Sequence, residues 1–131
     1  MKFFAKDPPR RFQVGNAVKF EMADCGSVAL SDDEQLTLLT GSGAEYDVAR
    51  KAWGFYATPS LNGRLVQFGL RGVLIKNRGT LRYFVLLVEK GHEQAFKTYC
   101  EHENLAVVTW LDDEAALARL EQLMQNPGGS P

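Results

Sequence analysis

The last third of the chain carries the pattern that most restricts its fold, because strand, helix, strand and helix signals follow one another there. Leu81–Glu89 is an almost unbroken apolar run, typical of a strand buried on both faces. His92–Glu103 repeats apolar residues at helical spacing, and Leu105–Leu111 is a second run rich in β-branched residues. A strand–helix–strand unit of this length connects its two strands by a crossover. We therefore expect these two strands to run parallel.

A final amphipathic helix follows, with Asp112 as its expected N-cap. Its apolar residues fall on one stripe and are Leu117, Leu120, Leu123 and Met124. This completes a C-terminal β-α-β-α segment.

The first 80 residues are dense in strand and turn signals. Residues 7–11 contain two prolines and are expected to be extended, and alternation on both sides of Asp24–Ser27 predicts a hairpin over residues 17–31. Ser31–Glu34 resembles a helix-capping box, but the threonines that follow favour a turn and a third strand. Residues 65–70 and 73–76 are expected to be short strands between glycine turns.

The predicted fold class is therefore α+β: a twisted, mostly antiparallel sheet followed by the β-α-β-α segment. We expect residues 1–125 to form a single domain and residues 126–131 a disordered tail. The predicted core comprises Val18, Phe20, Val28, Leu36, Leu38, Val85, Leu87, Phe96, Tyr99, Val107, Leu117 and Leu120.

Composition limits the class of protein. A chain of 131 residues can bury about two-thirds of its unfolded surface and needs no staple to fold. The start has no apolar signal region, and no stretch approaches the ~18 apolar residues of a membrane helix, so the expectation is a cytoplasmic protein without membrane contact.

No residue pattern marks a catalytic or metal site. Cys25 stands beside Asp24, which disfavours a reactive thiolate, and Cys100 falls on the apolar face of the expected helix. His92 and His102 lack a second ligand at metal spacing. The sequence therefore nominates no catalytic residue, no metal and no cofactor, and both thiols are expected to be reduced.

Charge is separated along the chain although the net charge is only −1. Residues 48–88 contain seven positive and no negative side chains, whereas the other 90 residues contain eight positive and sixteen negative ones. The same interval, which we call the basic segment, holds six of the fourteen aromatic residues.

Arginine forks bind phosphate or carboxylate, and exposed aromatic rings stack on bases or sugar faces. If the side chains of the basic segment converge, they form a site for an anionic ligand with a ring. The candidate ligand-binding residues are Arg64, Arg71, Lys76, Arg78, Arg82, Trp53 and Tyr56. The alternative is a solvated sheet face whose arginines pair with acids from elsewhere in the chain.

Three functions remain open. The leading hypothesis is a small non-enzymatic binding module for a nucleotide, a nucleotide-sugar, an acidic glycan or, with the weakest support, single-stranded nucleic acid. The second is a protein–protein interaction or self-associating scaffold module. The third is a small enzyme whose acid and base the sequence does not identify.

Overall fold

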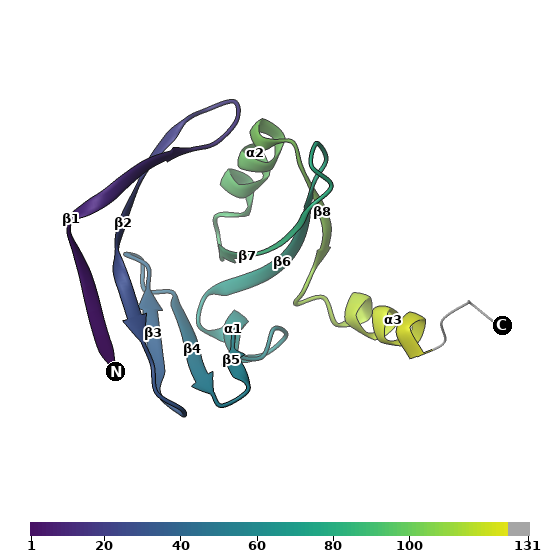
Figure 1. Ribbon diagram of the computed structural model, residues 1–131. Coiled ribbons are helices and arrows are strands. Elements are labelled where there is room, and N and C mark those ends of the chain that lie inside the picture. The colour runs from purple at the N-terminus through teal and green to yellow at the C-terminus, as the bar shows by residue number, and fades with distance from the viewer. Residues whose placement is uncertain (126–131) are drawn as a thin grey trace.

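The structure is a computed structural model that describes residues 1–125, so the tail predicted at 126–131 lies outside the described residues. At its centre is a three-stranded sheet, in which β6 (Leu70–Asn77) lies between β7 (Tyr83–Glu89) and β8 (Leu105–Trp110) (Figure 1). Both neighbours are antiparallel to β6. β7 and β8 are therefore parallel to each other, as expected, but β6 separates them.

The β-α-β-α prediction for the C-terminus is confirmed, and so is the α+β class. Helix α2 (Glu93–Glu103) follows β7, and helix α3 (Glu114–Gln125) follows β8. The capping prediction is wrong by one residue, because Asp113 accepts the Ala116 N–H at 3.0 Å while Asp112 binds Arg71.

Two further antiparallel sheets precede this one, so the mostly antiparallel pairing predicted for the first 80 residues is confirmed, although these strands are divided among separate sheets. β3 (Gln35–Leu39), β4 (Glu45–Lys51) and β5 (Gly54–Tyr56) form one sheet in that order. β1 (Lys2–Val14) and β2 (Phe20–Ala29) form a long hairpin that curves beside it (Figure 1).

The prediction of a hairpin over residues 17–31 is wrong. Residues 20–29 are one continuous strand paired with β1, and the true turn lies at 15–19. Gly26 has φ +147° and faces a register shift between Ala5 and Arg10, and a Cβ at residue 26 would collide with the Phe4 carbonyl. The turn signal thus marks an irregularity within a strand.

Between β5 and β6 the chain forms a short helix, α1 (Arg64–Gln67), where residues 65–70 were expected to be a strand. Leu65 is fully buried beneath it, packed with Ala44 and Leu70. The strand predicted at 73–76 and the turn and third strand after Ser31 are confirmed.

The core is centred on β6 and differs from the predicted one. The buried apolar residues are Ala44, Leu65, Leu70, Val73, Ile75, Val88 and Cys100. Eight of the twelve predicted core residues are exposed: Val18, Phe20, Val28, Leu38, Val85, Tyr99, Val107 and Leu120. The apolar run 81–89 was predicted to be a central strand. It forms β7, which is an edge strand whose first three residues are exposed, and β6 is the central strand instead.

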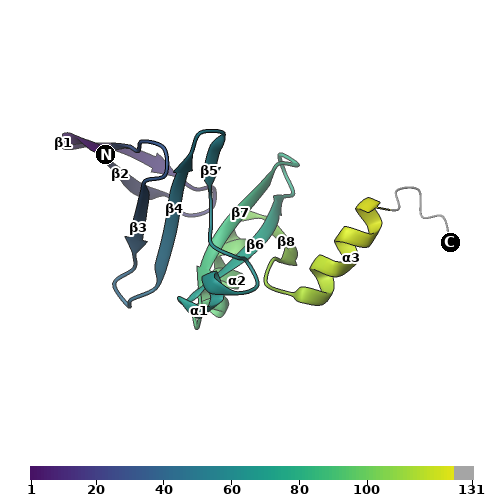
Figure 2. The ribbon, with the colours of Figure 1, turned by 90° about the horizontal axis from the view of Figure 1, so that it is seen from below.

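Helix α3 projects away from the rest of the molecule (Figure 2). It buries none of its residues. Of the helices in residues 1–125, none has the length and apolarity that crossing a membrane requires.

Candidate functional site

A small cavity lies between the β3–β4–β5 sheet and the segment that leads into α1. Its volume is about 280 Å³. We call it the Asp47–Arg64 cavity, and its lining residues are Gln35, Asp47, Ala49, Tyr56, Thr58, Pro59, Ser60 and Arg64.

Strand register brings the sheet side of the cavity together. Ala49 of β4 lies opposite Gln35 of β3 and Tyr56 of β5, and Asp47 lies opposite Thr37. Directly opposite residues share a face, and residues two apart on a strand do as well, so these five side chains belong to one face of the sheet.

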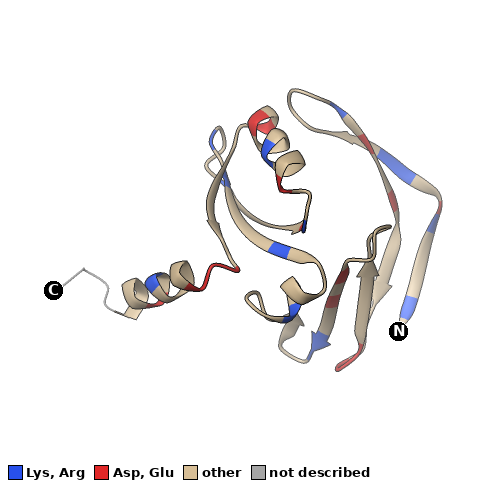
Figure 3. Cartoon of the chain, turned by 180° about the vertical axis from the view of Figure 1, so that it is seen from behind, with Lys and Arg blue, Asp and Glu red and all other residues tan. Residues whose placement is uncertain are grey.

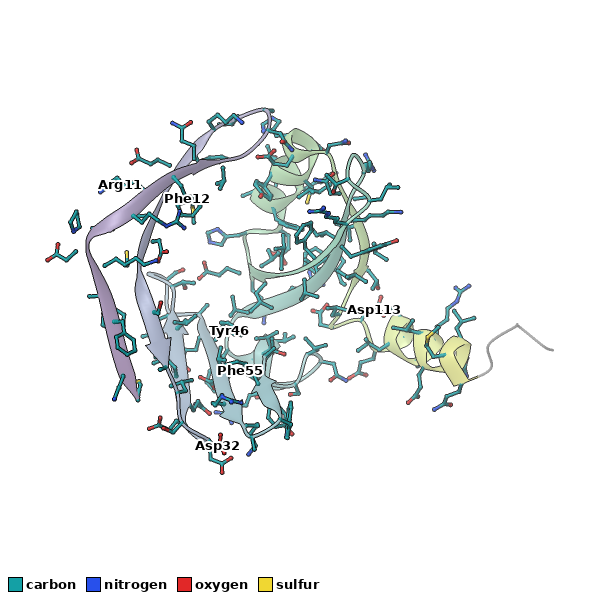
Figure 4. All side chains as sticks on the ribbon, viewed as in Figure 1. Arg11, Phe12, Asp32, Tyr46, Phe55 and Asp113 are labelled. Atoms are coloured by element: carbon teal, nitrogen blue, oxygen red, sulfur yellow. The ribbon has the colours of Figure 1, made fainter. Side chains whose placement is uncertain are left out.

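The other wall is fixed by the segment 57–64. The Tyr46 hydroxyl donates to the Ala57 carbonyl, and the Ser60 hydroxyl oxygen accepts the Arg64 backbone N–H at 2.7 Å. The buried Leu65 side chain holds the start of α1 in place. Tyr46 and Phe55 are marked in Figure 4, which locates this region among the side chains.

Asp47 and Arg64 face each other across the cavity. One carboxylate oxygen of Asp47 accepts the Thr37 hydroxyl at 2.6 Å, and the other lies 3.8 Å from a terminal nitrogen of Arg64. The Arg64 guanidinium also lies 5.2 Å from the centre of the Phe68 ring, and 62% of its side chain is exposed. Among the described residues its side-chain N–H groups have no hydrogen-bond acceptor, so it retains donors for a ligand.

Two aromatic rings stand beside this pair. Trp53 and Tyr56 meet edge to face with ring centres 5.7 Å apart, and Trp53 is 70% exposed. Exposed rings in such a pair offer flat apolar faces next to the cavity.

The structure does not bring the whole basic segment to this site. Its charges lie on β4, α1, β6 and the β6–β7 turn, and Figure 3 shows them spread over these elements. Only Tyr56 and Arg64 of the predicted residues line the cavity, with Trp53 adjacent.

Arg71 is engaged within the protein. Its guanidinium binds both carboxylate oxygens of Asp112, at 2.7 and 3.1 Å, and lies 3.4 Å from Glu93. It also stacks 4.1 Å from the centre of the Trp110 ring. For this arginine the geometry matches the alternative reading, in which acids from elsewhere in the chain neutralise it.

The remaining predicted residues belong to the other end of β6. Lys76 lies 5.3 Å from the Tyr83 ring centre, and Arg78 and Arg82 belong to the β6–β7 turn. Arg78 lines a separate groove beside α2. These three side chains are not part of the Asp47–Arg64 cavity.

Sequence reasoning missed Asp47, Ser60 and the polar residues of β3. Asp47 stands just outside the basic segment, whose definition by a lack of acids excluded it. The signal that was present is the polar alternation of Gln35 and Thr37, which marks a polar strand face.

A second cavity, of about 410 Å³, contains Glu89 and His92. The Glu89 carboxylate accepts the hydroxyls of Ser42 and Thr40 and lies 3.7 Å from His92 Nε2. These hydroxyls, that of Ser42 first, lower the pKa of Glu89 and make it a weak base. Within residues 1–125 no three His, Cys, Asp or Glu side chains are grouped so as to hold a metal ion.

The structure is an α+β protein with a small cavity beside the β3–β4–β5 antiparallel sheet. Comparison with models of protein families, with curated proteins and with solved structures finds no match. The function is therefore argued from the cavity itself.

Proposed function

We propose that this protein is a non-enzymatic binding module whose Asp47–Arg64 cavity holds a small acidic sugar, such as a sugar phosphate or the acidic residue of a glycan. The observation that carries the proposal is the pair formed by Arg64 and Asp47 beside the ring of Tyr56. A terminal nitrogen of Arg64 lies 3.8 Å from a carboxylate oxygen of Asp47, and the guanidinium still has N–H donors for a ligand.

The donors and acceptors match a sugar. Asp47 is an acceptor for a hydroxyl group, and the Arg64 fork donates to a phosphate or carboxylate in two directions. The rings of Tyr56 and Trp53 supply flat faces for the apolar side of a sugar ring.

The size of the cavity and the distribution of charge favour a small acidic sugar over a nucleotide-sugar or single-stranded nucleic acid. The cavity of about 280 Å³ is slightly smaller than typical ligand sites, which are ~300–1,000 Å³. It suits one ring with an anionic group, and the spread of the other basic residues leaves no continuous track for single-stranded nucleic acid.

An amide-shift NMR titration at low salt tests the proposal with glucose 1-phosphate, glucuronic acid, glucose and UMP. Saturable shifts at residues 35–64 with the two acidic sugars, weaker with glucose, support it. The variant Arg64→Gln should weaken acidic-sugar binding at least about tenfold, since a charge-assisted pair contributes about 1.5–3 kcal/mol.

The matched control is Arg82→Gln, which removes an exposed arginine far from the cavity and should leave binding unchanged. Flat spectra for both acidic sugars, or equal losses in the two variants, would overturn the proposal. A second function, self-association, has its own structural support and is argued next.

A further inference from the structure

Several apolar surfaces within residues 1–125 are exposed, and two of them, at the C-terminal end of the described chain, are complementary. The first is the stripe of α3, where Leu120, Leu123 and Met124 are 49, 52 and 67% exposed. An isolated helix of 12 residues is marginal in water, so α3 requires packing on its apolar face.

The second surface is a groove between α2 and β8, with a volume of about 470 Å³. Phe96 and Cys100 of α2 and Val107 and Trp110 of β8 form its apolar lining, and Lys97 and Glu101 lie at its rim. The edge-to-face contact of Phe96 and Trp110, 5.9 Å between ring centres, closes one end.

This groove is where a helix following β8 would complete the layer beside α2. Val107 and Trp110 lie opposite Ile75 and Val73, so the groove floor continues the sheet face that α2 covers. Helices cover such a face in a two-layer α/β arrangement, and this one has room for a second helix.

The chain's own α3 is held away from that groove. The Leu111 N–H donates to the Gly72 carbonyl at 2.8 Å, and Arg71 grips both oxygens of Asp112. Asp113, marked at the start of α3 in Figure 4, then caps the helix. These successive restraints direct α3 outward, as both ribbon views show (Figures 1 and 2).

Surface area gives an independent indication of a missing partner. The chain exposes 9473 Å², against about 6,900 Å² for a compact monomer of 14.6 kDa. Six fully extended residues would contribute at most about 750 Å² of this, which leaves about 1,800 Å² of excess in residues 1–125. Obligate homodimers bury about 1,000–2,500 Å² per subunit, so the excess matches what a second copy would cover.

We propose that two copies of this chain form a symmetric dimer by exchanging α3, each helix seating its stripe of Leu117, Leu120, Leu123 and Met124 in the α2–β8 groove of the other copy. The exchange is reciprocal, so it closes with twofold symmetry and leaves no unfilled groove. A net charge of −1 opposes the approach of the two copies only weakly.

The test is the molar mass of the full chain by light scattering and sedimentation. We expect twice the 14.6 kDa of one chain. Leu120→Glu with Leu123→Glu should raise the dimer dissociation constant at least about a hundredfold, because both side chains would enter an apolar contact. The matched control, Ala118→Glu with Gln122→Glu, adds the same charges to the opposite face of α3 and should remain dimeric.

A groove variant, Val107→Glu, attacks the same contact from the other side, at a residue that is 44% exposed in one chain. It should also be monomeric, and it keeps the test decisive if the α3 variant fails to fold. A monomeric native protein, or a dimer that resists both variants, overturns the proposal.

A cross-link separates exchange from an α3 that folds back on its own chain. In the variant Cys25→Ser with Leu123→Cys, oxidation should join the new thiol to Cys100 of the other copy and give a covalent dimer. A link formed only within one chain would show that the groove takes the chain's own helix and would overturn the exchange.

Discussion

Strand β6 and helix α3 are both apolar segments, yet the chain covers one and leaves the other open. Val73 and Ile75 of β6 are 0 and 2% exposed, because β7 and β8 flank the strand and α2 covers its face. α3 has no buried residue. The difference teaches that an apolar pattern reports a need for packing, while the position in the fold decides whether the same chain meets it.

The largest expected effect compares one residue from each region. Ile75→Ala should lower the free energy of unfolding by about 2–5 kcal/mol at every protein concentration, because it opens a cavity in the core. Leu120→Ala should have an effect that grows with protein concentration, since its side chain is covered only in the proposed dimer. Urea unfolding at several concentrations measures both, and a large, concentration-independent loss for Leu120→Ala would mean that α3 packs on its own chain.

The ion pair of Arg71 in β6 with Asp112, just before α3, should make a smaller contribution to stability. Arg71→Met leaves the Asp112 carboxylate, only 13% exposed, without its main partner and should cost about 1–3 kcal/mol of stability. The matched control is Arg82→Met, an exposed arginine whose loss should be neutral. Adding Asp112→Asn to Arg71→Met should restore part of the loss, and a fully additive double variant would contradict direct coupling of the pair.

The same pair gives a pH dependence with a definite sign. The hydrogen bonds from Arg71 lower the pKa of Asp112 below its ordinary value of 3.8. The carboxylate therefore contributes stability that is fully present above pH 3.8 and is lost as the pH falls through the lower folded-state pKa. Urea midpoints below pH 3.8 should converge for the native chain and Arg71→Met, and a constant difference down to strong acid would contradict this origin.

The smallest effect is kinetic and compares the two cysteines. Cys25 lies exposed on the hairpin, whereas Cys100 is buried on the α2 side of the groove, and burial raises the pKa of the Cys100 thiol. A thiol reagent at neutral pH should therefore modify Cys25 quickly and Cys100 slowly. The variant Cys25→Ser should abolish the fast phase alone, and a fast reaction that persists in it would show that Cys100 is open to solvent.

The sequence predicted the C-terminal elements because their signals are local. The helical spacing of residues 92–103 and the β-branched run after it identify α2 and β8 within a residue or two. Which strand is central is a non-local property. β7 has the more continuous apolar run, but β6, with Arg71, Gly72 and Lys76, takes the middle position because two strands pair with it.

The candidate site was predicted only in part for a related reason. Tyr56 and Arg64 stood out by residue type within the basic segment. Asp47 did not, because its role arises from register with Thr37 and from the turn that returns Arg64 to it 17 residues later. Arg71 was misplaced because its partner Asp112 is 41 residues away.

The contact at the tip of the first hairpin joins two distant parts of the chain. Glu103, 5% exposed, accepts the Asn16 N–H at 2.8 Å across 87 residues of chain. Within residues 1–125 the two strands of the hairpin pair only with each other, and their tip docks on the last turn of α2, which supplies Glu103. Docking of the hairpin tip is thus expected to depend on a folded α2, although in the described chain the hairpin's own strands pair only with each other.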